Sequence, residues 1–393
     1  MKENVYLAGA VRTPIGRFNG GLAEVSAAEL GASVLRESLR RADVAPEMID
    51  EVIFGNVVSA GQGQNLARQV TIRGGLAESV GATTINKVCG SGMKSVMFAT
   101  QAILCGDAAV IVAGGTECMS QAPYLLPKAR QGYGLGNGVL VDSLIRDGLW
   151  DIYDDCHMGS LTDACSADCG FTREQLDDYA VNSYQRAQAA QASGFFDKEM
   201  IAVEGGTKRK PVTVSADEEP QRFDEEKLRQ LRPAFGPEGL TTAGNASSLN
   251  DGAAALTVIS QVKLDELNVT PQGRVVAYCS TARKPGQFTL APIDAVARVL
   301  EMAGLKVEDI DLFEINEAFS LVPLAAMKDL SIPLEKVNPY GGGVALGHPI
   351  GASGTRVLVT LLNGLADRGG RYGVASLCIG GGEAVAMVVE RPN

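Results

Sequence analysis

The sequence predicts an α/β protein built from two similar halves. Strand-like and helix-like segments alternate up to residue 118 and again after Asp251, a pattern typical of sheets covered by helices. One stretch also recurs, because residues 42–56 (ADVAPEMIDEVIFGN) align without a gap with residues 303–317 (AGLKVEDIDLFEINE). Each copy follows a predicted helix and leads into a predicted strand. We therefore expect two halves of similar topology, with a site where their strand ends meet.

The elements of the first half follow from their hydrophobic patterns. A strand is expected at residues 5–8, and Ser26-Ala-Ala-Glu29 is a capping box that opens a helix with one apolar face. A strand at residues 51–58, a helix at 65–76 and a short strand at 82–85 follow. Residues 108–113 (AAVIVA) are apolar on both faces, which favours a strand covered on both sides.

The pattern weakens between residues 119 and 250, which we interpret as an excursion over the α/β body. Its one clear helix is expected at residues 172–192, opened by the capping box Thr172-Arg-Glu-Gln175. Cysteine and histidine also gather here, but their spacing fits no zinc pattern, so we predict no metal cluster from Cys156, His157, Cys165 and Cys169.

Composition restricts the class of partner. The net charge of −11 argues against a nucleic-acid surface, so an anionic ligand would need a local basic patch. No apolar run approaches membrane-spanning length, so we expect no membrane partner. Eight cysteines, with no room for a targeting segment before the strand at residues 5–8, indicate free thiols and a cytoplasmic location.

Cys89 lies in the stretch Asn86-Lys-Val-Cys-Gly-Ser-Gly-Met-Lys94, between a predicted strand and a helix expected from about Met93 to Leu104. Backbone N–H groups and the helix dipole favour negative charge at such a junction. We therefore expect the Cys89 thiol to ionise more easily than usual. Because a free cysteine is more often a small buried residue, other residues must decide its role.

Three stretches of the second half bear on Cys89. Asn316-Glu-Ala-Phe319 follows the repeated strand, and Cys378-Ile-Gly-Gly-Gly382 follows a strand expected at residues 372–377. Between them, His348 lies in the glycine-rich segment of residues 341–354, ahead of a helix. The chain contains only two histidines. A histidine in such a loop, beside two loop cysteines, is a candidate catalytic base.

Taken together, these motifs resemble the thiolases, and the resemblance runs from end to end and includes His157-Met-Gly159 and residues 244–252. It implies a five-layer α-β-α-β-α fold. Residues 1–118 and 251–270 would form the N-terminal half, residues 271–393 the C-terminal half, and residues 119–250 a loop domain for CoA binding and oligomerisation. Such proteins are usually homotetramers, arranged as a dimer of dimers.

The resemblance also implies the chemistry. Two acetyl-CoA molecules would condense to acetoacetyl-CoA and CoA, or the reverse thiolysis would run. Cys89 would carry the acetyl group as a thioester, and His348 would take the thiol proton and then help hold the enolate oxygen. Cys378 would remove the α-proton of the second acetyl-CoA, and Asn316 would position a water. The N–H groups of Cys89 and Gly380 would receive the oxyanion.

Binding residues carry over from the same resemblance. The CoA and acyl tunnel would be formed by Ala246, Ser247, His157, Met158, Leu149 and Phe235, with Arg222 near the adenine. We expect Glu317 to be structural, because a negatively charged carboxylate would not stabilise a carbanion nearby. No cofactor is required, since CoA is substrate and product.

Two segments depart from the common pattern. Gln287-Phe-Thr-Leu-Ala-Pro292, with Phe288, is similar to the mitochondrial-type acetoacetyl-CoA thiolases, which tolerate a 2-methyl branch and respond to potassium. This similarity implies a K⁺ site formed by Tyr184, Ala243, Gly244, Ala246 and Val344. Glu383-Ala384 stands where the family more often has a neutral residue followed by glycine, which bears on the shape of the Gly380 loop.

Three alternatives compete with this interpretation. A 3-ketoacyl-CoA thiolase of broader chain length, serving fatty-acid β-oxidation, would have the same motifs. A decarboxylating ketosynthase would carry a second histidine where Cys378 stands. A non-catalytic CoA-binding or lipid carrier is a different class altogether, and the intact Cys89, His348 and Cys378 argue against it.

Overall fold

The computed structural model describes residues 4–207 and 209–392, and nine of its strands form one continuous hydrogen-bonded path. The N-terminal part of that path runs β1 (Val5–Arg12), β12 (Asn250–Ser260), β5 (Val110–Cys118), β3 (Glu51–Gly55) and β4 (Gly81–Ile85). β3 is parallel to β4 and β5, whereas β12 is antiparallel to β1 and β5. The two-residue strand β2 (Gly16–Arg17) pairs with β12.

The C-terminal part runs β14 (Leu312–Ile315), β15 (Tyr372–Ile379), β16 (Glu383–Glu390) and β13 (Gly273–Ala282). Only two residue pairs join it to the N-terminal part, where Tyr6 and Leu7 of β1 face Arg274 and Gly273 of β13. The path therefore consists of two sheets that touch along a short seam.

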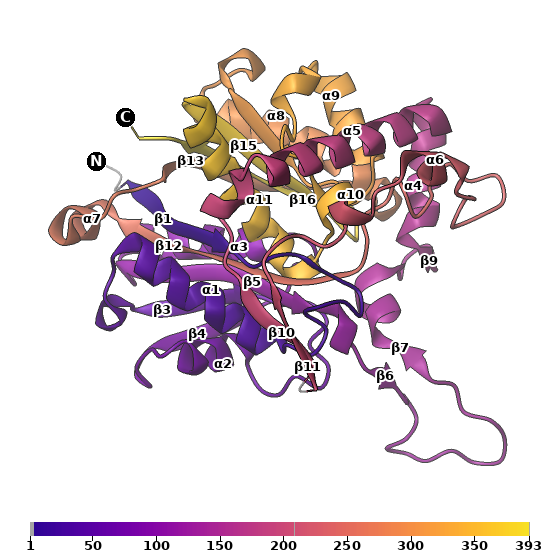
Figure 1. The fold of residues 1–393 in the computed structure, drawn as a ribbon, viewed down its shortest axis with the longest axis horizontal. Coiled ribbons are helices and arrows are strands. Elements are labelled where there is room, and N and C mark those ends of the chain that lie inside the picture. Colours follow the sequence, from indigo (N-terminus) through magenta and orange to yellow (C-terminus); the bar gives the residue numbers. More distant parts are fainter. Residues whose placement is uncertain (1–3, 208, 393) are drawn as a thin grey trace.

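Helices complete a five-layer α-β-α-β-α arrangement (Figure 1). α3 (Ser91–Cys105) and α11 (Ile350–Arg368) pack against each other between the two sheets, and their shared core contains residues of both halves, such as Met93, Leu358 and Val385. α1 (Ala27–Ala42) and α2 (Leu66–Arg73) cover the outer face of the N-terminal sheet. α8 (Ala291–Ala303) and α9 (Leu321–Leu330) cover the outer face of the other sheet.

The sequence repeat corresponds to a repeat in structure. α1 is followed by the short helix Pro46–Met48 and then by β3, and α8 is followed by the short helix Val307–Asp309 and then by β14. These short helices align with each other in the repeat. The prediction of two halves of similar topology is confirmed.

The expected strand at residues 51–58 is shorter than predicted, because β3 ends at Gly55. The N–H groups of Val57 and Val58 donate to the buried Glu117 carboxylate instead of to a neighbouring strand. The Glu117 side chain therefore takes the place of a neighbouring strand for this backbone. A hydrophobic pattern carries no information about such a side-chain contact, so it predicts too long a strand.

The segment between β5 and β12 contains more regular structure than predicted. α5 (Arg173–Ala192) begins after the Thr172 capping box, as expected, but α4 (Met158–Asp168) and α6 (Glu225–Gln230) are additional helices. His157 is the N-cap of α4, and its Nδ1 accepts a hydrogen bond from the Gly159 N–H. Histidine is not among the usual capping residues, so the sequence did not indicate this helix start. Short hairpins pair β8 (Trp150–Asp151) with β9 (Cys156–His157), and β10 (Val203–Thr207) with β11 (Lys210–Val214).

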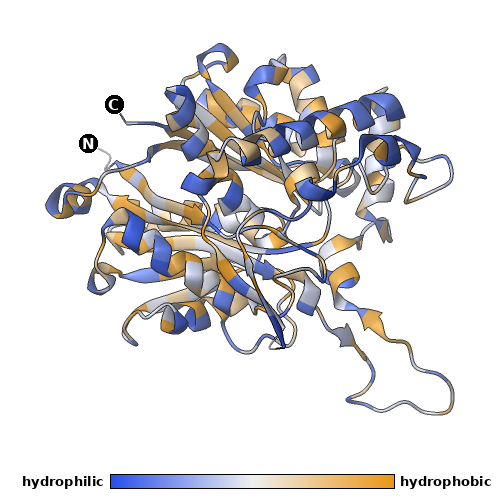
Figure 2. Cartoon of the chain, in the orientation of Figure 1, coloured by the Kyte–Doolittle hydropathy of each residue, from blue (hydrophilic) through white to orange (hydrophobic). Residues whose placement is uncertain are grey.

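A long hairpin loop projects from the body of the protein between β6 (Tyr124–Leu125) and β7 (Val141–Asp142) (Figure 1). Figure 2 shows hydrophobic residues in this projecting segment, especially at β7. Leu126, Leu135, Val139 and Leu140 are exposed. The loop therefore presents apolar side chains to solvent.

A buried ion-pair network fastens this intervening segment to the α/β body. Arg12 of β1 donates to Asp217 through two nitrogens, at 2.7 and 2.9 Å, and to Glu199 at 2.6 Å. All three side chains are at most 1% exposed. Because the buried guanidinium is paired with both carboxylates, we interpret this network as structural.

The remaining helices are α7 (Gln261–Leu267) and α10 (Gly343–Leu346). Within residues 4–207 and 209–392, no helix is long and apolar enough to cross a bilayer. The same residues contain no group of three or more histidine, cysteine, aspartate or glutamate side chains able to hold a metal ion.

Candidate active site

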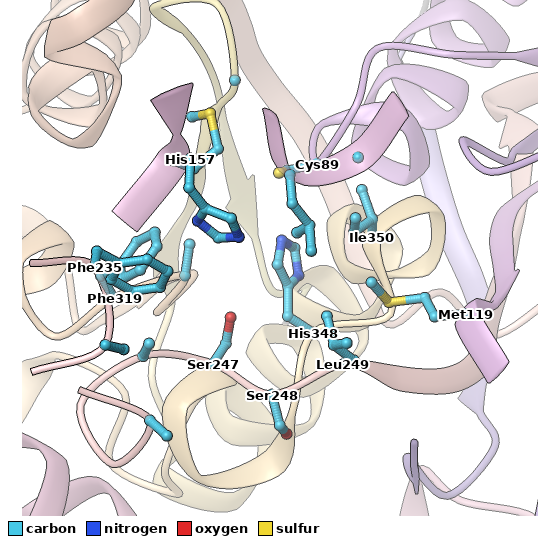
Figure 3. Close-up of a pocket in the computed structure, with 18 of the residues that line it drawn as sticks. Cys89, Met119, His157, Phe235, Ser247, Ser248, Leu249, Phe319, His348 and Ile350 are labelled. Atoms are coloured by element: carbon cyan, nitrogen blue, oxygen red, sulfur yellow. The ribbon is translucent and has the colours of Figure 1, made fainter. Parts of the chain in front are cut away.

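One mostly apolar pocket, with a cavity volume of about 340 Å³, receives loops from both halves and from the intervening segment. Cys89, His348 and Gly380 line it. Figure 3 shows the His348 imidazole facing Cys89 on one side of the pocket, with His157, Phe235 and Phe319 grouped on the other and Ser247 between them. Groups far apart in the sequence therefore meet in one cavity.

Cys89 lies between β4 and α3, two residues before the first helical residue. Val88 beside it adopts a left-handed backbone with φ of 45°, which is unusual for a β-branched residue and typical of functional sites. A Cβ at Gly90 would lie 2.5 Å from the Cδ1 atom of Ile379. Only glycine allows the Cys89 turn to approach the strand that carries Cys378 this closely.

The expectation of an unusually acidic Cys89 thiol is wrong. Burial raises the pKa of Cys89 to about 11, although the Gly380 N–H and the backbone N–H of Cys89 act in the opposite direction. Desolvation of the thiolate therefore outweighs the favourable dipoles at the start of α3. Near pH 7, Cys89 is therefore a neutral thiol and needs a base to react.

His348 offers such a base, and its tautomer follows from its neighbour. The Ser353 hydroxyl donates to the Pro349 carbonyl at 2.9 Å, so its single proton is used there. We assign the imidazole proton to Nδ1, which lies 2.6 Å from the Ser353 oxygen; this assignment follows from the hydrogen-bond network, in which the oxygen then accepts. Nε2 keeps its lone pair, is buried and has no hydrogen-bond partner among the described residues.

Burial lowers the pKa of His348 to about 3, and the positive charge of Arg356 acts in the same direction. The imidazole is therefore neutral near pH 7. Its backbone is fixed as well, because the His348 N–H donates to Asn250 Oδ1 at 2.9 Å. Gly347 has a φ of 106° and lies so close to Asn250 that a Cβ would clash at 2.4 Å, so this turn requires glycine.

Cys378 is fully buried on β15 and does not line the pocket surface, although Gly380, two residues later, does. Burial, followed by the proximity of the Cys89 thiol, raises the pKa of Cys378 well above its ordinary value. A Cβ at Gly380 would lie 3.6 Å or more from Met158 and Val88, which is ordinary van der Waals contact, so crowding does not require glycine here.

Glu383, which stands where thiolases more often have a neutral residue, lies beside these loops. Lys87 Nζ donates to Glu383 Oε2 at 2.5 Å, which links the Cys89 loop to the start of β16. The backbone next to it still requires glycine, since Gly382 has a φ of 89° and a Cβ there would lie 2.5 Å from the Arg283 carbonyl. The charged residue therefore adds an inter-loop ion pair.

Asn316 and Glu317 follow β14 and are both fully buried. Asn316 Oδ1 accepts a hydrogen bond from Arg356 Nη2 at 3.3 Å, while its Nδ2 has no hydrogen-bond partner among the described residues. The Glu317 carboxylate accepts four hydrogen bonds, from Tyr179, Ser183, Asn338 and the Val344 N–H. Glu317 therefore ties α5 to the C-terminal half, as a structural residue does.

The residues assigned to CoA and acyl binding fall into two groups. Those that line the main pocket are Leu149, His157, Met158, Phe235, Ala246, Ser247 and Phe288. His157 stacks on Phe235 with ring centroids 4.5 Å apart. Arg222 instead lines an adjoining pocket of about 310 Å³, where it lies 3.7 Å from Glu219.

That adjoining pocket also receives Tyr184, Ala243 and Gly244 from the suggested K⁺ set, and Ala243 lines both pockets. Val344 packs in the same hydrophobic cluster as Tyr184, whereas Ala246 lines the main pocket.

Sequence reasoning missed Ser353 and Arg356. Both lie on the first turns of α11, after His348, and a hydroxyl about one helical turn beyond a candidate base was the available signal for Ser353. For Arg356 there was no signal, because nothing in the local pattern marks an arginine as buried.

The chain matches known proteins along its length. Residues 5–262 match the family model for the N-terminal domain of thiolase, and residues 269–391 match that for the thiolase C-terminal domain.

Individual relatives agree. An acetyl-CoA acetyltransferase of Yarrowia lipolytica is 50% identical over 386 residues, covering 98% of this chain and 96% of the relative. The acetyl-CoA acetyltransferase of Escherichia coli is 48% identical over 393 residues, covering 100% of both chains. The crystal structure of Acat5 thiolase from Ascaris suum in complex with coenzyme A has a TM-score of 0.94 and 42% identity, covering 99% of this chain and 100% of that one.

Proposed function

Because the chain belongs to the thiolase family, we propose that it is an acetyl-CoA C-acetyltransferase. It joins two acetyl-CoA molecules into acetoacetyl-CoA and CoA, and it runs the reverse thiolysis. Relatives at 48–50% identity over nearly the full length bear that name, and a CoA-bound relative shares the fold.

The observation that carries the mechanism is the pairing of a thiol with an imidazole of defined tautomer in one pocket. Cys89 and His348 line the same cavity, and the free lone pair of His348 is on Nε2. The backbone N–H groups of Cys89 and Gly380 act to lower the pKa of Cys89, so both favour negative charge beside its sulfur. They are suited to stabilise the negative oxygen that forms when this sulfur attacks a thioester carbonyl.

In the first half-reaction, Cys89 sulfur bonds to the acetyl carbon of acetyl-CoA while its proton passes to His348 Nε2. The bond from that carbon to the CoA sulfur breaks, and the Cys378 thiol protonates the leaving thiolate. Acetyl-Cys89, protonated His348 and a Cys378 thiolate remain. Because burial raises the pKa of Cys378, this thiolate is a strong base.

In the second half-reaction, the Cys378 thiolate removes the α-proton of a second acetyl-CoA. The new Nε2–H of His348 and a water held by Asn316 stabilise the enolate oxygen. The carbanion attacks acetyl-Cys89, and the Cys89 thiolate leaves and regains its proton from His348. Every proton is returned, so the cycle needs no redox group or metal.

Two variants separate these steps. Cys89→Ala should abolish covalent acetylation by acetyl-CoA, measured as mass added to the Cys89 peptide. Cys378→Ala should still acetylate, more slowly, but should form no acetoacetyl-CoA. If both variants failed at the same step, this division of labour would be wrong, and absence of acetylation in the wild-type protein would favour a carrier.

Thiolysis of 3-ketoacyl-CoA substrates of increasing length separates the proposal from the β-oxidation alternative. We expect the rate to be highest with the four-carbon substrate. A rate that rises beyond four carbons would favour the broader 3-ketoacyl-CoA thiolase. Thiolysis of 2-methylacetoacetyl-CoA measures tolerance of a branch beside Phe288, which packs edge-on against Phe319.

We also propose K⁺ binding near Tyr184, Ala243, Gly244, Ala246 and Val344. Tyr184, Ala243 and Gly244 line one pocket with the acidic Glu219, and carbonyl and hydroxyl oxygens suit K⁺. The ion would stiffen the wall shared with the CoA pocket and take part in no bond change. KCl should raise the melting temperature more than NaCl at equal ionic strength, and equal effects would contradict the proposal.

A homotetramer in the cytoplasm completes the proposal. The exposed apolar residues of the projecting β6–β7 loop favour burial against other subunits, and all eight cysteines are free, as in a reducing compartment. Sedimentation should give a tetramer that Leu135→Asp dissociates, whereas a monomer would refute the assembly. Cell fractionation tests the compartment.

A further inference from the structure

Arg356 is a buried cation that the fold alone does not explain. It lies on α11 and is 2% exposed. Its ion-pair partner Glu314 is also buried, but the closest approach, from Nη1 to Oε2, is 3.5 Å. Burial raises the pKa of Glu314 to about 8, so this carboxyl is a weak counterion near neutral pH.

The contrast with Arg12 is informative, since both arginines are almost completely buried. Arg12 satisfies two carboxylates with three short hydrogen bonds. For Arg356, the described residues supply a single hydrogen bond, from Nη2 to Asn316 Oδ1, while Nε and Nη1 donate no hydrogen bond to them and Nη1 has only the long ion pair with Glu314. A buried charge kept in place for so little stabilisation suggests a role other than stability.

The contact with Asn316 has a directional consequence. A guanidinium can only donate hydrogen bonds, so the oxygen of the Asn316 amide must face Arg356. The NH₂ group is then turned away from Arg356, and it has no hydrogen-bond partner among the described residues. Without Arg356, no charged donor would distinguish the oxygen from the nitrogen of this amide.

Arg356 also lies near the reacting groups. Its charge contributes to the low pKa of His348, and Asn316 hydrogen-bonds through its N–H to Ser376, two residues before Cys378 on β15. We propose that Arg356 is a positioning residue for the condensation step, because it holds the Asn316 oxygen and thereby presents the Asn316 NH₂ group to the water beside the enolate.

This inference rests on the proposed function, since it concerns the half-reaction in which the enolate forms. It predicts an effect that is specific for one step. Acetylation of Cys89 does not use Asn316, so loss of Arg356 should slow condensation much more than acetylation. A hydrogen bond from a charged donor typically corresponds to about tenfold to about a hundredfold in rate.

The test is a double-variant cycle with Arg356→Met and Asn316→Ala. Each single variant should lower condensation by about tenfold to about a hundredfold while acetylation of Cys89 stays within about threefold of wild type. The double variant should be no slower than Asn316→Ala within about twofold, because Arg356 acts through Asn316. Arg368→Met, an exposed arginine later on α11, is the matched control and should change neither rate.

Arg356→Lys keeps a charged donor and should recover part of the condensation rate. If Arg356→Met does not fold, Arg356→Lys and Arg356→Gln replace it in the cycle. Both of these side chains can still donate a hydrogen bond to Asn316. Both variants should therefore keep a higher condensation rate than Asn316→Ala. Equal losses in acetylation and condensation would overturn the inference, as would effects that multiply in the double variant. A wild-type protein that acetylates Cys89 but forms no acetoacetyl-CoA would instead refute the proposed function.

Discussion

Replacing Ser353 with alanine removes the acceptor that fixes the proton on His348 Nδ1. The bond is 2.6 Å long and both residues are buried, so Ser353→Ala leaves a buried N–H without a partner, at a cost of about 1–3 kcal/mol. The imidazole can avoid this cost by moving the proton to Nε2, the nitrogen that must accept the proton of Cys89. We therefore expect kcat/KM to fall by about tenfold to about a hundredfold.

Two measurements test this expectation. Loss of acetoacetyl-CoA absorbance gives kcat/KM for thiolysis, and ring ¹⁵N chemical shifts report the tautomer directly. The chain has only two histidines, so a histidine-labelled sample contains two ring systems to assign. Ser33→Ala is the control, because Ser33 donates to the Leu30 carbonyl at 2.7 Å on α1 and loses a similar intrahelical bond without touching an imidazole.

The reasoning would be refuted if Ser353→Ala kept kcat/KM within about twofold of wild type. It would fail equally if the rate fell while His348 remained protonated on Nδ1. In either case the hydroxyl would contribute only to packing of the first turn of α11.

Two further predictions concern ionised groups. Because burial raises the pKa of Cys89 to about 11, alkylation of Cys89 by iodoacetamide, followed by peptide mass spectrometry, should accelerate with pH up to about pH 11; a plateau below pH 8 would contradict this. Arg12→Met should lower the free energy of unfolding by about 3–5 kcal/mol, because it leaves Glu199 and Asp217 buried without a counterion. The same substitution at the exposed Arg40 should leave the free energy of unfolding nearly unchanged, and equal losses in denaturant titrations would argue against the network.

Local rules were enough to predict much of the fold. The capping boxes at Ser26 and Thr172 mark real helix starts, and the internal repeat identifies two halves of like topology. Two elements that the sequence did not predict correctly, α4 and the end of β3, have physical explanations. α4 is capped by an imidazole, and β3 is cut short because the Glu117 side chain binds the following backbone.

For the candidate site, the sequence could name the reacting groups but not their surroundings. Cys89 and His348 do line one pocket, whereas their catalytic roles stay predictions. The acidity of Cys89 was misjudged because the helix terminus is visible in the sequence and the depth of burial is not. The orientations of His348 and Asn316 depend on Ser353 and Arg356, whose contacts exist only in three dimensions.

The short seam between β1 and β13 has a consequence for how this protein tolerates change. The two sheets share only two backbone pairs there, so their relative alignment depends mainly on how α3 and α11 interlock. Cys89 lies on the connection between β4 and α3 of the N-terminal half, whereas Cys378 lies on β15 of the C-terminal sheet. A cavity-forming substitution at the α3–α11 contact, remote from either thiol, would therefore shift Cys89 relative to Cys378 before it unfolded either half.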